Sequence, residues 1–453
     1  MPSEEPRIPE RVLQIGEGRF LRGFVDWILE QLARREVYPA RVVVVFPRAH
    51  EEEAKIPWMR AGGAFHVAIR GLEQGRRVDV VDTVSVVSRV LDPYREWEAF
   101  LQTAKNPSLE MIITNTTEAG LMWRDEPYPG PGRCPDTVAG KLTLWLWERY
   151  QAFDGSQESG VDLVPCELLE NNGAWLRSLI LRYAEAWQLP PSLSAWIQSA
   201  NRFYNTLVDS IITPADPADD RVQGDSLAVT REPFYSWLLE GPPDLPARWQ
   251  LPQAGLAVEV VPDLRPYREL KVRVLNGAHT AMAALGLLAG LRTVGEVMAD
   301  HTFRGFLDAL LLEEVAPTLV AFGLSESKVR EFIAKVAERF QNPYLHHQLR
   351  DIQLQARTKV RTRLFPSLRD RWLATGEVPR RLTVAVVAQT LWMLREEGVT
   401  DPSEERIVAQ MAEWWDDPWV GDETFQAAAR QWTRRLAQVQ GLEDVHRVLT
   451  EAL

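Results

Sequence analysis

Cysteine, clustered histidine and long apolar runs are all scarce in this sequence. The 2 cysteines, Cys134 and Cys166, are too few for a disulfide framework. The 7 histidines are scattered without zinc-binding spacing, so we expect no metal site. No run reaches the roughly 18 apolar residues that a membrane span needs, and residues 1–11 are polar and proline-rich without the apolar segment of an export signal. The sequence therefore predicts a cytoplasmic protein with no membrane partner.

An excess of positive charge is also missing. The formal net charge is -12 and the isoelectric point is near 5.3, with basic residues scattered along most of the chain. Because a nucleic-acid backbone would be repelled by such a surface, we expect no nucleic-acid partner. A small-molecule ligand is the remaining expectation. Monomer and homodimer both stay open.

Strand and helix patterns alternate in the first part of the chain, and only helical patterns follow. Strands are predicted over residues 12–15, 41–46, 65–69, 78–90, 111–114, 162–165 and 258–261. Helices are predicted over 21–35, over 136–150 with Asp136 as N-cap, over 174–187, and, among the later ones, over 294–318. The layout predicts an α/β Rossmann-like domain with a mostly parallel sheet at 1–265, then an all-helical domain at 266–453.

The segment from Lys271 to Thr280 combines a helical apolar stripe with three polar groups. At about 100° per residue, Lys271, Asn276 and His279 fan over one arc beside the stripe, and Gly277 leaves room for close approach to the backbone. A lysine at an apolar edge can act as a base, while an amide and an imidazole can hold an alkoxide or carbonyl oxygen. A core helix with a snorkelling lysine and a buried histidine explains the same spacing.

The chain contains a K-x4-N-x2-H motif, formed by Lys271, Asn276 and His279. Through this motif it resembles the polyol-specific long-chain dehydrogenases, also called the mannitol dehydrogenase family. The longer string KVRVLNGAHT is most similar to the tagaturonate reductase (altronate oxidoreductase) branch. The resemblance implies an arrangement like that of 6-phosphogluconate dehydrogenase, NAD(H) as cofactor, no metal, and hydride transfer to or from a sugar acid. Lys271 would take the hydroxyl proton, Asn276 would stabilise the alkoxide, and His279 would orient the substrate.

A glycine turn follows the first predicted strand, as in a nucleotide-binding unit. Gly16 and Gly18 alone also match many turns that bind nothing. The family writes this turn G-x-G-x-F-x-R, which adds Phe20 and Arg22 to the implied cofactor site. The second strand ends without the usual carboxylate, and Arg48 stands nearby, so that NADP remains an alternative to NAD.

Two further loops carry implied cofactor contacts. Asn115 and Thr117 lie in a turn that resembles the family's T-x-E-x-G turn along the cofactor, and Glu118 is the implied proton relay. Asn172 lies in a strand, acid, N-G, helix segment that the family shares. A surface carboxylate at Glu118 and a simple turn at Asn172 are the alternatives.

Asn205 matches the family's N-x-x-V-D-R-I-x-P segment, in which this asparagine supplies the second amide for the substrate oxygen. The chain departs from the pattern at Ser210, where arginine is usual. Farther on, Lys359 and Arg363 match the branch pattern K-x3-R, and His346 matches the histidine of N-P-x-x-x-H. Four residues apart on a helix, the two cations share a face on which they can clasp a carboxylate. Without the resemblance they would be a solvated basic face.

These observations predict an NAD-dependent oxidoreductase that interconverts tagaturonate and altronate. The alternatives are a sibling reaction, on fructuronate and mannonate or on a mannitol-type polyol, and a non-catalytic nucleotide-binding regulator. The presence of Lys271, Asn276, His279 and Asn205 together argues against the regulator.

Overall fold

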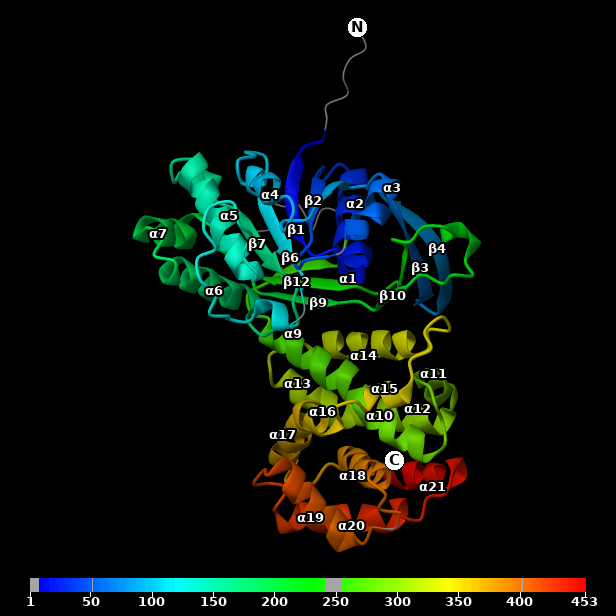
Figure 1. The fold of residues 1–453 in the computed structure, drawn as a ribbon. Helices are drawn as coiled ribbons and strands as arrows, with labels where there is room; N and C mark the ends of the chain where they lie inside the picture. Colours follow the sequence, from blue (N-terminus) through cyan, green and yellow to red (C-terminus); the bar gives the residue numbers. More distant parts are fainter. Residues whose placement is uncertain (1–7, 51, 117, 242–254, 401) are drawn as a thin grey trace. The chain divides into compact units, whose positions relative to one another are not determined.

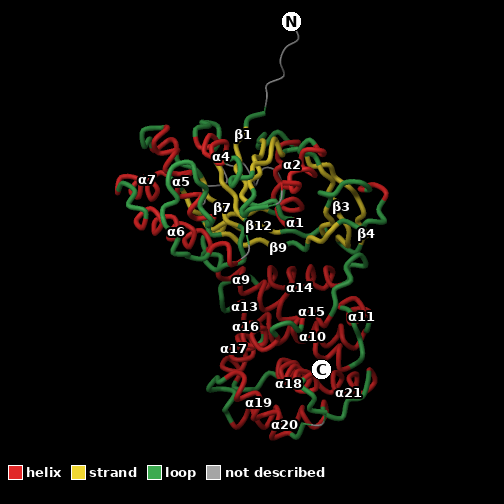
Figure 2. The backbone as a smooth tube through the Cα atoms, in the orientation of Figure 1, coloured by secondary structure: helices red, strands yellow, loops and turns green. Residues whose placement is uncertain are grey.

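The computed structural model describes residues 8–50, 52–116, 118–241, 255–400 and 402–453. The chain divides into two compact units, residues 1–70 with 78–264, and residues 71–77 with 265–453. Residues 71–77 are the end of β3, a two-residue turn and the start of β4, and sequence reasoning had left them with the first domain. Strands lie in the first unit and helices make up most of the second (Figure 2).

The first unit is built on a six-stranded sheet in the order β5-β2-β1-β6-β7-β8, in which every neighbouring pair is parallel. This confirms the predicted Rossmann-like sheet. The strand order reverses at β1 and β6, the place where such sheets bind ligands at their carboxyl ends. The strands are β1 (Glu10–Ile15), β2 (Arg41–Val45), β5 (Val87–Leu91), β6 (Met111–Thr114), β7 (Asp162–Pro165) and β8 (Arg202–Phe203).

Helices cover both faces of this sheet (Figure 1). Because successive side chains of a strand alternate, Val42 and Val44 pack toward α2, whereas Val43 and Val45 belong to the core beneath α4, α5 and α6. The helices are α1 (Arg19–Leu21), the π-helical η1 (Arg22–Asp26), α2 (Trp27–Arg34), η2 (Glu52–Lys55), α3 (Ile56–Ala61), α4 (Trp97–Ala104), η3 (Glu118–Leu121), α5 (Val138–Ala152), η4 (Gln157–Ser159), α6 (Asn172–Ala186), α7 (Pro191–Ala200) and η5 (Asp220–Val222).

Two smaller sheets, of order β10-β11-β3-β4 and β13-β12-β9, complete the strands that the structure describes. The single strand predicted at 78–90 was wrong. It is two strands, β4 and β5, and only β5 joins the six-stranded sheet. The remaining strands are β3 (Phe65–Glu73), β4 (Arg76–Val84), β9 (Thr206–Asp209), β10 (Ile212–Pro214), β11 (Val229–Arg231), β12 (Ser236–Glu240) and β13 (Val258–Val261).

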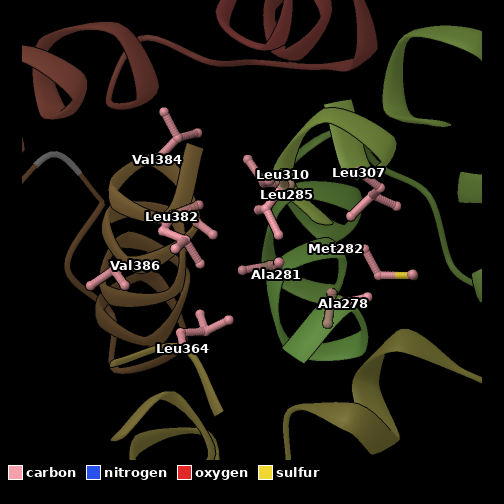
Figure 3. Packing of buried hydrophobic residues seen from close by; sticks show 14 of the residues in the cluster. Ala278, Ala281, Met282, Leu285, Leu307, Leu310, Leu364, Leu382, Val384 and Val386 are labelled. Carbon is pink, nitrogen blue, oxygen red and sulfur yellow. The ribbon is translucent and has the colours of Figure 1, made fainter. Parts of the chain in front are cut away.

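The second unit is helical from Arg265, as predicted. Its core centres on α10 and α18, where Ala281 and Leu285 face Leu382 (Figure 3). The helices are α9 (Arg265–Leu270), η7 (Lys271–Asn276), α10 (Gly277–Leu288), α11 (Val294–Ala299), α12 (His301–Ala309), η8 (Leu310–Val315), α13 (Ala316–Val320), α14 (Glu326–Phe340), α15 (Leu349–Ile352), α16 (Ala356–Arg363), α17 (Phe365–Thr375), α18 (Arg380–Glu396), α19 (Glu404–Trp415), α20 (Glu423–Leu436) and α21 (Leu442–Ala452).

Two helix boundaries differ from the prediction because side chains compete for backbone groups. The helix expected at 294–318 is interrupted at Asp300, whose carboxylate accepts hydrogen bonds from the amides of Thr302 and Phe303 and starts α12. The N-cap of α5 is Thr137 and not Asp136, since the Thr137 hydroxyl accepts from the Gly140 amide at 3.0 Å.

Candidate active site

The Lys271 segment is one continuous helical stretch, as predicted, but its middle turn is a π-helix. Lys271 and Asn276 are the first and last residues of η7. In an α-helix, residues five apart would point about 140° apart. A π turn closes at the fifth residue and therefore brings Lys271 and Asn276 to the same face. Leu275, Ala278 and Met282 are buried beneath them, and Val272 only partly.

His279 lies between two rings of the same unit. Its ring centroid is 4.3 Å from that of Phe340 and 4.9 Å from that of His347. Burial lowers the pKa of His279 well below its ordinary value, and nearby positive charge lowers it further. The imidazole is therefore neutral at pH 7. Besides His347, the charges come from Arg339, Arg363 and Lys359.

The cations on α16 stand close to His279, and each is tied to the protein. Lys359 donates from Nζ to the carbonyl of Ile352 at 2.8 Å. Arg363 donates to the hydroxyl of Thr280 at 3.4 Å, next to His279 in the chain. Burial lowers the pKa of both groups, and for Lys359 the charge of Arg363 adds to the effect. These shifts show two cations that are partly removed from water.

The two adjacent histidines, His346 and His347, differ in their surroundings. His346, which the resemblance indicated, is exposed, whereas His347 faces His279. The pKa of His347 is lowered overall, chiefly by burial. The charge of Lys359 lowers it further, and the carboxylate of Asp351 partly offsets the two. Gly277 is buried, and a Cβ there would lie 3.4 Å from the carbonyl oxygen of Arg363, an ordinary van der Waals contact.

Asn205 precedes β9 in the first unit, and two contacts hold its amide. The side-chain oxygen accepts from the Ala174 amide at 3.0 Å, and the nitrogen donates to Glu240 at 2.6 Å. The other oxygen of Glu240 accepts from the Leu264 amide at 3.2 Å. An amide nitrogen carries two hydrogens, of which Glu240 takes one. Sequence reasoning missed Glu240, whose only signal was an acid at the end of a buried strand.

Asn172 and Gly173 position the Asn205 segment. The Asn172 side chain is completely buried, and its amide bonds the backbone of Pro165, Glu167 and Thr206. Asn172 is therefore committed to the protein and offers no surface to a cofactor, contrary to expectation. A Cβ at Gly173 would lie 2.4 Å from the carbonyl of Tyr204, so only glycine admits that chain.

The first glycine turn has the geometry that the sequence suggested. Gly16 has φ +133°, and a Cβ there would lie 2.9 Å from the carbonyl oxygen of Asn115. Nothing lies within 4 Å of the corresponding position at Gly18, which precedes α1. This backbone is thus open to a pyrophosphate, and the residues fit a dinucleotide. Arg22 donates to the carbonyl of Glu17 and so supports the turn. Phe20 stacks on Phe24 at 4.8 Å.

Two other predicted cofactor residues, Arg48 and Asn115, lie in loops that follow strands of the same sheet. Arg48 is exposed in the loop after β2. Asn115 donates to the Cys166 carbonyl at 2.7 Å. Thr117 lies outside the described residues. Glu118 is the first residue of η3, but the structure does not describe its side chain.

A buried acid that the sequence analysis did not select, Glu167, holds the loop after β6. It accepts from the hydroxyl of Thr114 at 2.9 Å and from the amide of Thr116 at 2.9 Å. Burial raises the pKa of Glu167.

No three His, Cys, Asp or Glu side chains in the described ranges are grouped so as to hold a metal ion. Among the helices that the structure describes, none has both the length and the apolarity required to cross a membrane.

The chain belongs to the mannitol dehydrogenase family. Residues 10–253 match the mannitol dehydrogenase Rossmann domain, and residues 263–451 match the mannitol dehydrogenase C-terminal domain. The resemblance drawn from Lys271, Asn276 and His279 is thereby confirmed.

Its relatives include proteins named altronate oxidoreductase. The one from Klebsiella pneumoniae strain 342 is 37% identical over 96% of this chain and 92% of its own length. Those from Halalkalibacterium halodurans and Bacillus subtilis are each 39% identical over 84% of this chain, and over 75% and 79% of their own lengths.

Solved structures share the fold. A D-sorbitol dehydrogenase in substrate-free form has a TM-score of 0.79 at 20% identity, covering 98% of each chain. The mannitol 2-dehydrogenase of Pseudomonas fluorescens, solved with NAD and D-mannitol, has a TM-score of 0.67 at 21% identity, covering 98% of this chain and 94% of its own.

Proposed function

We propose that this protein is an NAD-dependent oxidoreductase that interconverts tagaturonate and altronate. The observation that carries the proposal is the π turn that begins at Lys271 and ends at Asn276 and is followed by neutral His279, near which the partly buried cations of α16 lie. The names of the relatives support the same substrate pair. We further propose a cytoplasmic location and a monomer or homodimer.

In the oxidation direction the hydroxyl proton of the substrate passes to the Lys271 amine while the carbon-bound hydrogen leaves as hydride. The nicotinamide cofactor, held at the backbone of Gly16 and Gly18, would supply the hydride acceptor in oxidation and the hydride donor in reduction. Asn276 and Asn205 donate to the developing alkoxide. His279, held neutral by burial, can accept or donate a hydrogen bond to a substrate hydroxyl. Glu118 remains our proposed proton relay.

The cofactor contacts are proposed on the open first turn and the neighbouring loops. The backbone at Gly16 and Gly18 would hold the pyrophosphate, with Phe20 and Arg22 supporting the turn. Asn115 and Thr117 are proposed to line the nicotinamide side, and Arg48 the adenosine side. Asn172 serves to position Asn205, in place of the direct contact first expected.

The carboxylate of the substrate is assigned to Lys359 and Arg363. A protein of net charge -12 repels a free sugar acid unless cations stand at its binding site. His347 is adjacent to these cations, while exposed His346 is the weaker candidate for the same role. A neutral polyol would need no such pair.

The test is a reductase assay of purified protein with a panel of ketoses. Tagaturonate with NADH should give the highest kcat/KM, fructuronate a lower value, and fructose a value lower by about 100-fold or more, because the lost charge-assisted bonds are worth a few kcal/mol. Equal turnover of fructose and tagaturonate would favour a mannitol-type enzyme. A preference for fructuronate would favour the mannonate reaction. Binding of NADH without any turnover would point to a regulator.

Repeating the assay with NADPH tests the cofactor. We expect NADH to be preferred. A preference for NADPH would mean that Arg48 recognises a 2′-phosphate.

A further inference from the structure

Arg273 lies inside the π turn that carries Lys271 and Asn276, and its charge is buried. Only 3% of its side chain is exposed. Its guanidinium donates to Glu269 at 2.6 Å, to Asp370 at 2.6 Å and to the hydroxyl of Thr318 at 3.2 Å. It also lies over the ring of Phe322 at 4.8 Å.

These partners belong to different elements. Glu269 is on α9, Thr318 on α13 and Asp370 on α17, where Arg369 also contacts Asp370 at 3.2 Å. A guanidinium is a planar fork that holds several acceptors in set directions. Arg273 therefore ties the π turn to α13 and α17 from its buried side.

The register of this turn decides where the reactive groups point. A π turn brings residues five apart to one face, whereas relaxation to an α-helix would rotate them about 140° apart. π-helical turns are rare and need support from their surroundings. A local relaxation of η7 to an α-helix would therefore be enough to move Lys271 and Asn276 onto different faces.

We infer that Arg273 and Asp370 are positioning residues that hold the π turn and thereby keep Lys271 and Asn276 on one face. Neither needs to touch the substrate. This inference rests on the proposed function, because it assigns the base to Lys271. Buried ion pairs are not generally the most stabilising solution for a core, which fits a role in specifying a conformation.

The experiment compares Arg273→Met with Arg381→Met in the full-length protein. Arg381 is a matched control: its side chain is 9% exposed, it pairs with Glu314 in the same helical unit, and it lies in the first turn of α18, away from η7. Both variants should lose thermal stability. Only Arg273→Met should lower kcat for tagaturonate, by roughly 30- to 100-fold as expected for a misplaced catalytic group, and shift the pH profile of kcat with little change in KM for NADH.

Two further measurements separate positioning from general damage. Amides of residues 271–276 should exchange hydrogen faster in Arg273→Met than in Arg381→Met. Arg273→Lys should recover part of kcat because it restores one ion pair, and Asp370→Asn should resemble a milder Arg273→Met.

The outcomes distinguish this inference from the proposed function. Absence of tagaturonate turnover in the wild type would overturn the proposed function and this inference with it. Wild-type turnover, together with an Arg273→Met variant whose kcat, pH profile and amide exchange equal those of Arg381→Met, would overturn only the positioning role.

Discussion

At the scale of single residues, the groups that we propose to react and the groups that we propose to bind the substrate lie on different elements. Lys271 and Asn276 share the face of a π turn, whereas Lys359 and Arg363 lie on α16 and are tied to neighbouring oxygen atoms. The neutral state of His279 follows from burial and from the cations around it. Loss of the base and loss of a binding cation should therefore change different kinetic constants.

Lys271→Ala should remove nearly all turnover and leave NADH affinity near normal, since general base catalysis contributes about 10²- to 10⁴-fold. Steady-state kinetics and NADH fluorescence titration measure the two effects. Retention of more than about a tenth of wild-type kcat, a barrier change of only about 1.4 kcal/mol, would exclude Lys271 as the base.

Arg363→Ala and Lys359→Ala should instead raise KM for tagaturonate about ten-fold or more, because each removes a charge-assisted bond. KM for a slowly reduced neutral ketose should change far less. Lys335→Ala serves as the control, since Lys335 is a surface cation paired with Glu331. Unchanged tagaturonate kinetics in both variants would contradict the carboxylate assignment.

At the scale of elements, close approaches of backbone determine where Asn205 stands. The start of α6 packs directly on the chain at Tyr204 and Asn205, and Asn172 bonds the amide of Thr206 at 2.8 Å. The helix and the strand are thus joined by close backbone packing at Gly173 and by the side chains of Asn172 and Asn205. Any group added at Gly173 must push the Asn205 segment away.

Gly173→Ala should destabilise the protein by about 1–3 kcal/mol, the usual cost of overpacking, and should also lower kcat because Asn205 moves. Gly305→Ala is the control, because nothing lies within 4 Å of its Cβ position on α12. That substitution should be neutral or slightly stabilising. Denaturant unfolding and kcat measurements check both variants, and equal behaviour of the two would show that the Gly173 contact is unimportant.

At the scale of the whole molecule, buried ionisable groups link folding stability to pH. Burial raises the pKa of Asp26 to about 7. The hydrogen bond from Gln14 and the charge of Arg22 lower this pKa, but burial outweighs them. One oxygen of Asp26 and the side-chain oxygen of Gln14 are buried without a hydrogen-bond partner. When Asp26 is protonated, its carboxyl group has an O–H that can donate a hydrogen bond in this buried region, whereas the ionised carboxylate has no donor.

The pKa of Asp26 is higher in the folded protein than in the unfolded chain, so the unfolded chain loses this proton first as the pH rises. Asp26 therefore contributes stability that is fully present below about pH 4 and is lost as the pH rises through about 7. Asp26→Asn should match the wild type near pH 4 and exceed its stability at pH 8, by at most about 4 kcal/mol. Unfolding curves at both pH values measure the difference. Exposed Asp125→Asn, the same charge change at the surface, should show no such pH dependence. A constant difference for Asp26→Asn would mean that its carboxyl is ionised in the folded protein.

Local patterns were enough to predict the class of fold and the family. The glycine turn at Gly16, the buried parallel strands and the string around Lys271 are short-range features, and short-range sterics and periodicity determine them. The net charge and the α16 cations indicated an acidic substrate only together with the family resemblance, because their spacing alone also fits a solvated basic face. The boundaries at Asp300 and Thr137 failed because capping depends on which side chain reaches the free amides.

Only the tertiary structure showed which of two neighbouring residues lies beside His279. His347 faces His279 and His346 does not, and nothing in two adjacent histidines distinguishes them. Glu240 holds Asn205 from 35 positions away, and Arg273 reaches Asp370 across 97 positions. The π turn that aligns Lys271 with Asn276 depends on such contacts. The sequence by itself indicated the groups that we propose to react, and packing between distant segments determined their directions, because a side chain's orientation is set by the surfaces that close around it.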